Sequence, residues 1–176
     1  GLPINIAKDN YAKIIAQART ELGIFSLSKT VVNELLWAYY TNGHKGFCIE
    51  YDSEQLQKSL SNGHLHSVLN VQYKNDTPEF SMNSITNNLV DDTQFIKCLI
   101  ATKSMAWERE EEIRITLYSS GLFGISPESV TGIYFGLRMP ESDKELVKNS
   151  LKGRSIKYYQ MKLKPNSYLL EAELIK

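Results

Sequence analysis

The sequence predicts an α+β fold, with a mixed or mostly antiparallel sheet backed by helices. Segments with apolar residues at helical spacing are interspersed with segments that alternate with period two. The chain has 176 residues, the length of one domain, and no internal repeat, low-complexity tract or long linker divides it. We therefore expect one α+β domain over residues 1–176, forming part of a longer parent protein.

The first two predicted elements are a helix and a short strand. Apolar residues from Ile14 to Leu22 recur at helical spacing, and Gly23 follows where helices commonly end. Residues 24–28 are typical of a strand. Period two then places Ser26 and Ser28 on the same face of that strand.

A second helix and a strand form the next predicted corner. The helix carries an apolar stripe from Val32 to Tyr40, with Ser28 or Thr30 as its cap and Asn42-Gly43 as its end. We expect Trp37 and Tyr40 to pack into the core. The strand "GFCIEYD" follows at once.

The rest of the chain continues the same mixed pattern. Apolar residues at helical spacing predict a helix from Leu89 to about Met105, and the strand "WEREEEIRITLY" is expected to follow it. The other expected elements are a helix at 53–60, a strand at 65–73, a strand at 130–137, a helix at 141–151, and strands at 155–163 and 167–175.

Composition excludes several classes of function. Twenty basic and twenty acidic residues leave a formal charge of zero, so no global field favours nucleic acid, and no segment is long and apolar enough for a membrane span. Two cysteines, Cys48 and Cys98, are too few for a disulfide framework and are expected to be buried thiols in a reducing, cytoplasmic compartment. Because the chain starts at Gly1 without Met, we expect residues before it to be missing.

The sequence gives little support for a metal site or a nucleophilic cysteine. His64 and His66 stand at i, i+2, but a zinc site made from them with His44 or Cys48 lacks a third ligand at motif spacing. A nucleophilic pair of Cys48 and His44 is equally unsupported. We expect no metal.

Two nearby carboxylates are more informative. On a strand, Glu110 and Glu112 would share a face about 7 Å apart, with Arg114 beyond them. A solvated strand face explains such a row, and so does a polar site that includes Trp107 and Lys103. Close carboxylates repel, which raises at least one pKa unless the cations offset them. We expect Glu112 in a concave pocket, with Arg114 or Lys103 within reach and Trp107 or an N-terminal serine as a wall.

Four separated motifs resemble an uncharacterised bacterial family, domain of unknown function 2971. They are "FSLS", "LLWAYYTNGHKGFCIEYD", "KSMAWEREEEIR" and "VTGIYFGLRMP", and the resemblance covers roughly residues 22–173. The N-terminal strand and turn common in that family do not occur here. The fitting positions are Ser26, Ser28, Trp37, Tyr40, His44, Lys45, Gly46, Cys48, Glu50, Lys103, Trp107, Glu110, Glu112, Arg114 and Gly136.

The resemblance implies a site without naming its substrate. A weaker similarity connects Ser26-Leu27-Ser28 and Glu110-Glu111-Glu112 to ADP-ribosyltransferases, which would make NAD the cofactor, although the arginine that binds phosphate has no counterpart. The roles that we assign are catalytic for Glu112 and Glu110; substrate-binding for Ser26, Ser28, His44, Lys45, Lys103 and Arg114; and structural for Trp37, Tyr40, Gly46, Cys48 and Trp107.

Two hypotheses of different classes follow. In the first, the chain is the major part of a nucleotide-handling enzyme with Glu112 as its key carboxylate. In the second, it is a non-catalytic binding or interaction module of a bacterial stress or phage-defence system. Substrate, partner and oligomeric state are not given by the sequence.

Overall fold

The computed structural model describes residues 4–79 and 92–175, and the chain divides into two compact units. The first unit comprises Gly1–Lys29 and Gly63–Leu122, and the second comprises Thr30–Asn62 and Phe123–Lys176. Helices accompany open sheets that are mostly antiparallel, so the predicted α+β class is confirmed. The organisation of residues 1–176 as one domain stays a prediction.

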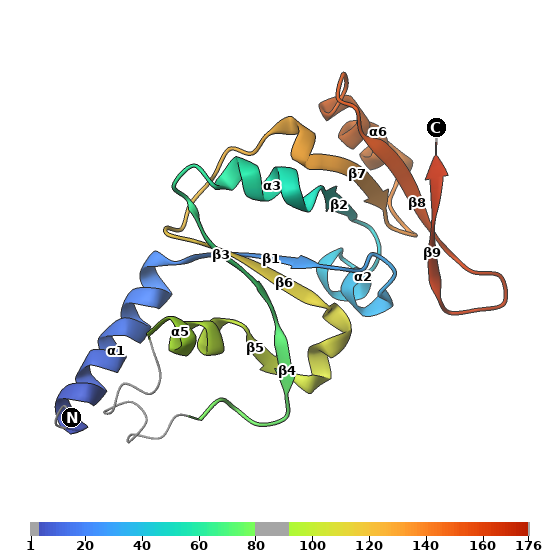
Figure 1. The fold of residues 1–176 in the computed structure, drawn as a ribbon. Helices are drawn as coiled ribbons and strands as arrows, with labels where there is room; N and C mark the ends of the chain where they lie inside the picture. Colours follow the sequence, from blue (N-terminus) through green and yellow to red (C-terminus); the bar gives the residue numbers. More distant parts are fainter. Residues whose placement is uncertain (1–3, 80–91, 176) are drawn as a thin grey trace. The chain divides into compact units, whose positions relative to one another are not determined.

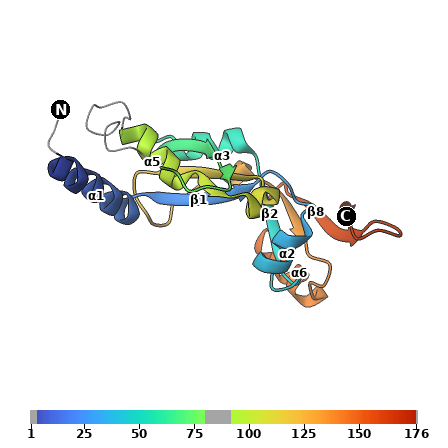
Figure 2. The ribbon, with the colours of Figure 1, turned by 90° about the horizontal axis from the view of Figure 1, so that it is seen from below.

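A three-stranded antiparallel sheet in the order β1-β6-β3 forms the centre of the first unit. Its strands are β1 (Gly23–Ser28), β6 (Glu112–Leu117) and β3 (Leu65–Asn70). Helix α1 (Ile4–Glu21) leads directly into β1 (Figures 1 and 2) and contacts α5 (Asp92–Ile100). A short parallel pair, β4 (Gln72–Lys74) and β5 (Thr102–Ser104), is followed by the 3-10 helix η1 (Met105–Glu110).

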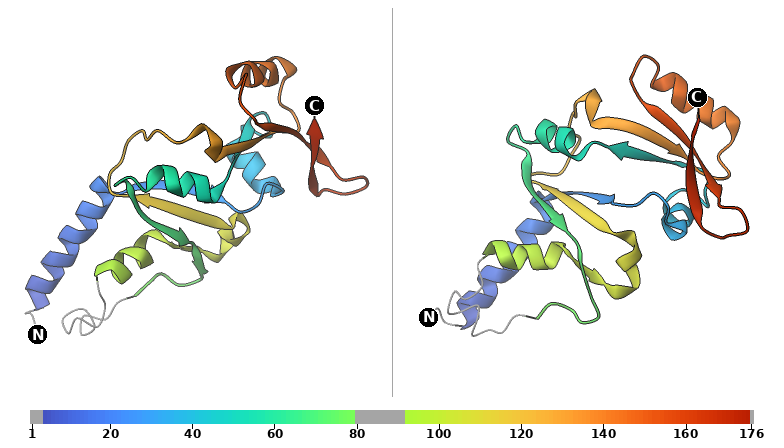
Figure 3. Two further views of the ribbon diagram at one scale, coloured as in Figure 1. Left: turned by 45° about the horizontal axis from the view of Figure 1, so that its top comes forward. Right: turned by 45° about the vertical axis from the view of Figure 1, so that its right-hand side comes forward.

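The second unit is built on a four-stranded sheet in the order β2-β7-β8-β9. Its strands are β2 (Phe47–Tyr51), β7 (Val130–Phe135), β8 (Lys157–Leu163) and β9 (Leu170–Ile175). Strands β7 and β8 are parallel, and α6 (Glu141–Ser150) connects them (Figure 3), because parallel neighbours need a crossover. The unit also contains α2 (Glu34–Tyr40), α3 (Ser53–Leu60) and the 3-10 turn η2 (Pro127–Ser129).

The four-stranded sheet of the second unit buries apolar side chains in two clusters. Trp37 of α2 packs with Met161 and Leu170 in one of them. Ile133 and Phe135 of β7 lie in the other, against the apolar face of α6. Tyr134, between them on β7, packs against the first cluster, so the alternation along β7 anchors the sheet on both faces.

Two predicted boundaries in the first half of the chain are wrong. Asn33, not Ser28 or Thr30, caps α2: its Oδ1 accepts from the backbone N–H groups of Leu35 and Leu36. The strand predicted at 65–73 is divided at Val71, whose N–H bonds to Glu112. The next backbone N–H, that of Gln72, donates to Ala101 instead, so the chain leaves β6 for β5.

The region before the carboxylates also differs from its prediction. The helix expected to reach Met105 ends at Ile100, and its predicted start at Leu89 lies outside the described residues. The strand predicted from Trp107 begins only at Glu112, because residues 105–110 form η1. Strands and helices predicted after residue 130 are confirmed within a few residues.

Candidate functional site

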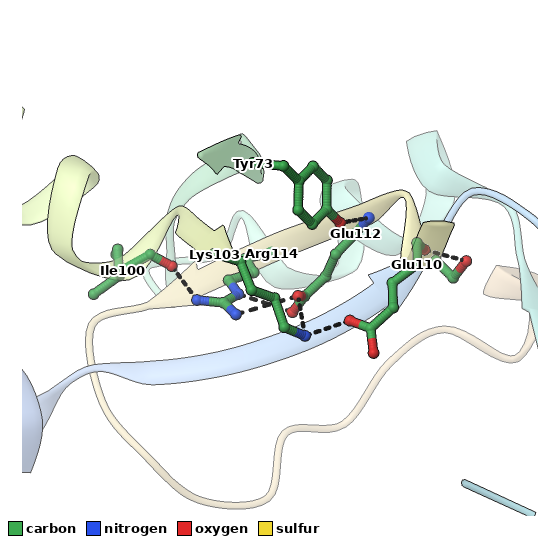
Figure 4. A network of polar contacts seen from close by, with 7 residues as sticks. Tyr73, Ile100, Lys103, Glu110, Glu112 and Arg114 are labelled. Atoms are coloured by element: carbon green, nitrogen blue, oxygen red, sulfur yellow. Dashed lines mark hydrogen bonds and ion pairs between the residues drawn. The ribbon is translucent and has the colours of Figure 1, made fainter. Parts of the chain in front are cut away.

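Polar side chains gather on one face of the β1-β6-β3 sheet in the first unit (Figure 4). The antiparallel register pairs Ser26 with Arg114 and Ser28 with Glu112. Because directly opposed residues share a face, two serines and an acid-base pair from strands more than eighty residues apart meet there. The structure thus brings together the Ser-x-Ser motif and the end of the acidic motif.

Glu110 reaches this place by a turn rather than along a strand. Glu111 has a left-handed backbone with φ of 46°, which ends η1 and starts β6. The Ser28 hydroxyl donates to the Glu110 carbonyl at 2.7 Å. Glu110 and Glu112 are both 7% exposed, so of the two interpretations of this row, the solvated strand face is wrong.

Lys103 of β5 connects the two carboxylates. Its Nζ forms ion pairs with Oε2 of Glu110 and, at 3.3 Å, with Oε2 of Glu112. The same ammonium lies 5.1 Å from the centre of the Trp107 ring, within the range of a cation–π contact. Trp107 is 41% exposed, so one indole forms a partly open edge of the network.

Arg114 fixes Glu112 from the other side. Its Nε donates to Oε1 of Glu112 at 2.8 Å, and Nη2 donates to Oε2 at 3.2 Å, a two-pronged arrangement that orients the carboxylate. Its Nη1 donates to the carbonyl of Ile100 at the end of α5. The Glu112 backbone N–H donates to the Tyr73 hydroxyl at 2.8 Å, so residues of β4, β5 and β6 hold Glu112 in place.

The network favours the charged forms of both Glu112 and Lys103. Burial alone would raise the pKa of Glu112, but hydrogen bonds from Arg114, Ser26 and Lys103 lower it to about 2. Burial lowers the pKa of Lys103, yet its bonds to the two carboxylates raise it overall. Near neutral pH Glu112 is therefore a fixed anion and Lys103 a fixed cation. The cations offset the repulsion between the carboxylates, as the sequence allowed.

The remaining predicted site residues belong to the second unit. Trp37 is 3% exposed and its Nε1 donates to Val31 at 2.6 Å, so its predicted burial is confirmed. Tyr40 is 68% exposed, and its predicted burial is wrong. The seven-residue α2 makes fewer than two turns and ends at Tyr40, so Trp37 is its buried anchor.

His44, Lys45 and Gly46 form the loop after α2. His44 has a left-handed φ of 69°, and its ring stacks on Trp37 with centroids 6.5 Å apart. Burial and the nearby Arg138 lower the pKa of His44, against the influence of Glu34. The loop is pinned to the end of β7, since Gly136 donates to the carbonyl of Gly46 at 2.9 Å. The roles of His44 and Lys45 in binding stay predictions.

Both cysteines are free thiols. Burial, and next the Glu50 carboxylate, raise the pKa of the Cys48 thiol, which is the opposite of what a nucleophile requires. Within residues 4–79 and 92–175, no three His, Cys, Asp or Glu side chains gather as metal ligands would. In the same ranges, every helix is too short or too polar to cross a membrane.

Sequence reasoning missed two partners of the network, Tyr73 and the Ile100 carbonyl. Tyr73 pairs with Lys103 between β4 and β5, thirty residues apart in the chain. The Val71 N–H donates to the Glu112 carbonyl, so the chain already lies beside Glu112 two residues before the Tyr73 phenol accepts from its backbone N–H. The carbonyl belongs to the end of a helix that the sequence extends too far.

One comparison with known proteins gives a match. Residues 36–115 match the family model described as "Protein of unknown function (DUF2971)". The resemblance to this family is confirmed. The DUF2971 match includes His44, Lys103, Glu112 and Arg114, whereas Ser26 lies outside it. No curated protein and no solved structure matches the chain.

Proposed function

We propose that the polar face of the first unit binds a nucleotide, with NAD as the first ligand to test. The observation that carries this proposal is the register of β1 and β6, which sets Ser26 and Ser28 beside Arg114 and Glu112. Hydroxyl and carboxylate groups on rigid neighbouring strands are suited to hydrogen bonding with ribose. The partly exposed Trp107 offers an aromatic ring for stacking with a base.

The charges of the network support a binding role for Glu112 rather than proton transfer. A carboxylate has about four acceptor positions. Arg114 and Lys103 occupy three of them, and a hydrogen bond from Ser26 also contributes to its low pKa. Glu112 thus holds two cations and a serine hydroxyl, and a ribose hydroxyl would take the place of that serine.

The enzymatic form of this proposal is an ADP-ribosyltransferase-like reaction. The meeting of Ser-x-Ser and Glu112 on adjacent strands supports it, because the weaker resemblance assigns these groups to the nicotinamide ribose. In this form Glu112 contacts the ribose hydroxyl as a permanent anion. A bacterial, cytoplasmic protein is part of the proposal, and the two free thiols fit a reducing compartment.

One observation favours the second hypothesis, a non-catalytic interaction module. Two cations and two carboxylates neutralise each other within the network, as they would in a purely structural cluster. Such a cluster would stabilise the fold while another surface binds a partner. The first hypothesis requires that a nucleotide bind this polar face, and the second does not.

The test is a calorimetric titration of the unsubstituted chain, called the parent chain below, with NAD, ADP-ribose, ATP and GTP. We expect at least one of them to bind, and Glu112→Gln to weaken binding about tenfold or more, equivalent to about 1.4 kcal/mol. Glu173→Gln is the matched control, because it removes the charge of an exposed glutamate paired with Lys162 in the second unit. If no nucleotide binds the folded parent chain, the interaction module replaces this proposal.

A further inference from the structure

A second polar cluster lies on the same sheet, where β3 pairs with β6. The register of this pair shifts between Leu65 and Ser67, so an extra residue, His66, stands opposite the partner strand. Such bulges turn a side chain away from the regular alternation and recur next to active sites. Here the bulge brings the His66 ring back toward β6.

Three side chains meet at this bulge within hydrogen-bond distance. Nδ1 of His66 lies 3.1 Å from Oγ of Ser67 and 3.2 Å from Oγ1 of Thr116. The two hydroxyl oxygens are 2.7 Å apart. Tyr118 packs edge-on against the imidazole at 5.0 Å between centroids, which restricts the rotation of the ring.

The protons of this cluster can be assigned in two ways. Thr116 is fully buried, and its hydroxyl donates to the Ser67 carbonyl at 3.1 Å. Ser67 then has one proton, which goes either to Thr116 or to an unprotonated Nδ1 of His66. In the second case the imidazole is placed to remove that proton, at a distance usual for a nucleophile and its base.

We propose that Ser67 is a nucleophile, with His66 as its general base, for an electrophilic phosphoryl or acyl centre. As Oγ bonds to that centre, its proton passes to Nδ1 of His66, and the leaving group departs with the electron pair of the broken bond. The Thr116 hydroxyl can turn from the carbonyl to Oγ and stabilise the charge that develops there. Ser67 is only partly buried, so a reagent can reach it.

This activity does not depend on nucleotide binding. Thr116 follows Arg114 by two residues on β6, so both clusters lie on the same face of that strand. The reaction nevertheless uses only the imidazole and the two hydroxyls. Failure of one proposal therefore leaves the other open to its own test.

The experiment treats the whole chain with a fluorophosphonate probe and locates the adduct by peptide mass spectrometry. In this reaction Oγ bonds to phosphorus, the P–F bond breaks and fluoride leaves. We expect one adduct, on Ser67, and none on Ser59, which is the matched control. The Ser59 hydroxyl is 3.2 Å from that of Ser129, but no imidazole contacts this pair among the hydrogen bonds of the described residues.

Variants then separate the base from the nucleophile. His66→Gln should slow labelling of Ser67 roughly a hundredfold or more, because glutamine cannot take up the proton. Thr116→Val, which keeps the buried volume, should slow it less, and circular dichroism checks that each variant is folded. An unlabelled Ser67 in the parent chain, or equal labelling rates in folded His66→Gln and parent, would overturn the proposal. The parent result decides even if a variant fails to fold.

Discussion

Replacing Glu112 by Gln tests the charge network of the first unit. The pKa of Glu112 falls from an ordinary value of 4.5 to about 2 in the folded chain. Each pKa unit between the folded and unfolded states corresponds to about 1.4 kcal/mol, so ionisation of Glu112 stabilises the fold by about 3 kcal/mol near neutral pH. The substitution should remove most of this stabilisation, because it leaves Lys103 and Arg114 with one carboxylate between them.

The pH dependence gives the expected effect a distinct signature. A depressed pKa stabilises the folded chain fully above 4.5, and the contribution decreases as the pH falls from 4.5 through 2. At pH 3 the same relation leaves about 1.4 kcal/mol. The stability gap between parent and Glu112→Gln should therefore close by more than half between pH 7 and pH 3.

Urea unfolding followed by circular dichroism at these two pH values measures the gap. Glu173→Gln serves as control, because Glu173 is 54% exposed in its pair with Lys162 and such surface pairs contribute below about 1 kcal/mol. The reasoning is refuted if Glu112→Gln unfolds within about 0.5 kcal/mol of the parent at pH 7 with an unchanged pH profile.

Three further predictions concern the second unit. Trp37→Ala should cost roughly 3 to 5 kcal/mol in urea unfolding, and a loss below 1 kcal/mol would contradict its place in the core. Gly136→Ala should lower stability by about 1 to 3 kcal/mol, because the added Cβ would lie 2.3 Å from the His44 carbonyl oxygen. Gly124→Ala is the control and should be neutral, because its added Cβ meets nothing within 4 Å. Equal urea unfolding midpoints for the two variants would contradict this prediction. Because the pKa of Cys48 is raised, its alkylation by iodoacetamide at pH 8 should be slower in the folded chain than in urea, and faster labelling in the folded chain would contradict the assignment.

Sequence patterns predict the fold correctly where the secondary structure of a segment depends on its own residues. The strands that begin at Val130 and Lys157 and the helix between them have a clear period and clear turn residues, and all three are found. The helix cap at Asn33 was missed because Ser28 and Thr30 are equally suitable cap residues in sequence. In the structure, Ser28 belongs to β1 instead.

The candidate site depends partly on tertiary contacts, which sequence patterns do not predict. The motif around Glu112 correctly indicated Lys103 and Arg114 as partners, because all three lie within a dozen residues. A left-handed Glu111 and the parallel pairing of Tyr73 with Lys103 depend on tertiary contacts. The sequence therefore predicted the charges of the site but not the turn that gathers them.

Nuclear magnetic resonance of the two tryptophan indole N–H groups can show whether a nucleotide binds at the polar face of the first unit. The chain has two tryptophans: Trp107 beside the Lys103 ammonium, and Trp37 buried in the second unit. On titration with NAD and the other nucleotides, we expect the Trp107 resonance to shift and saturate while that of Trp37 stays in place. A folded chain in which the Trp107 resonance does not move with any nucleotide at millimolar concentration would contradict it.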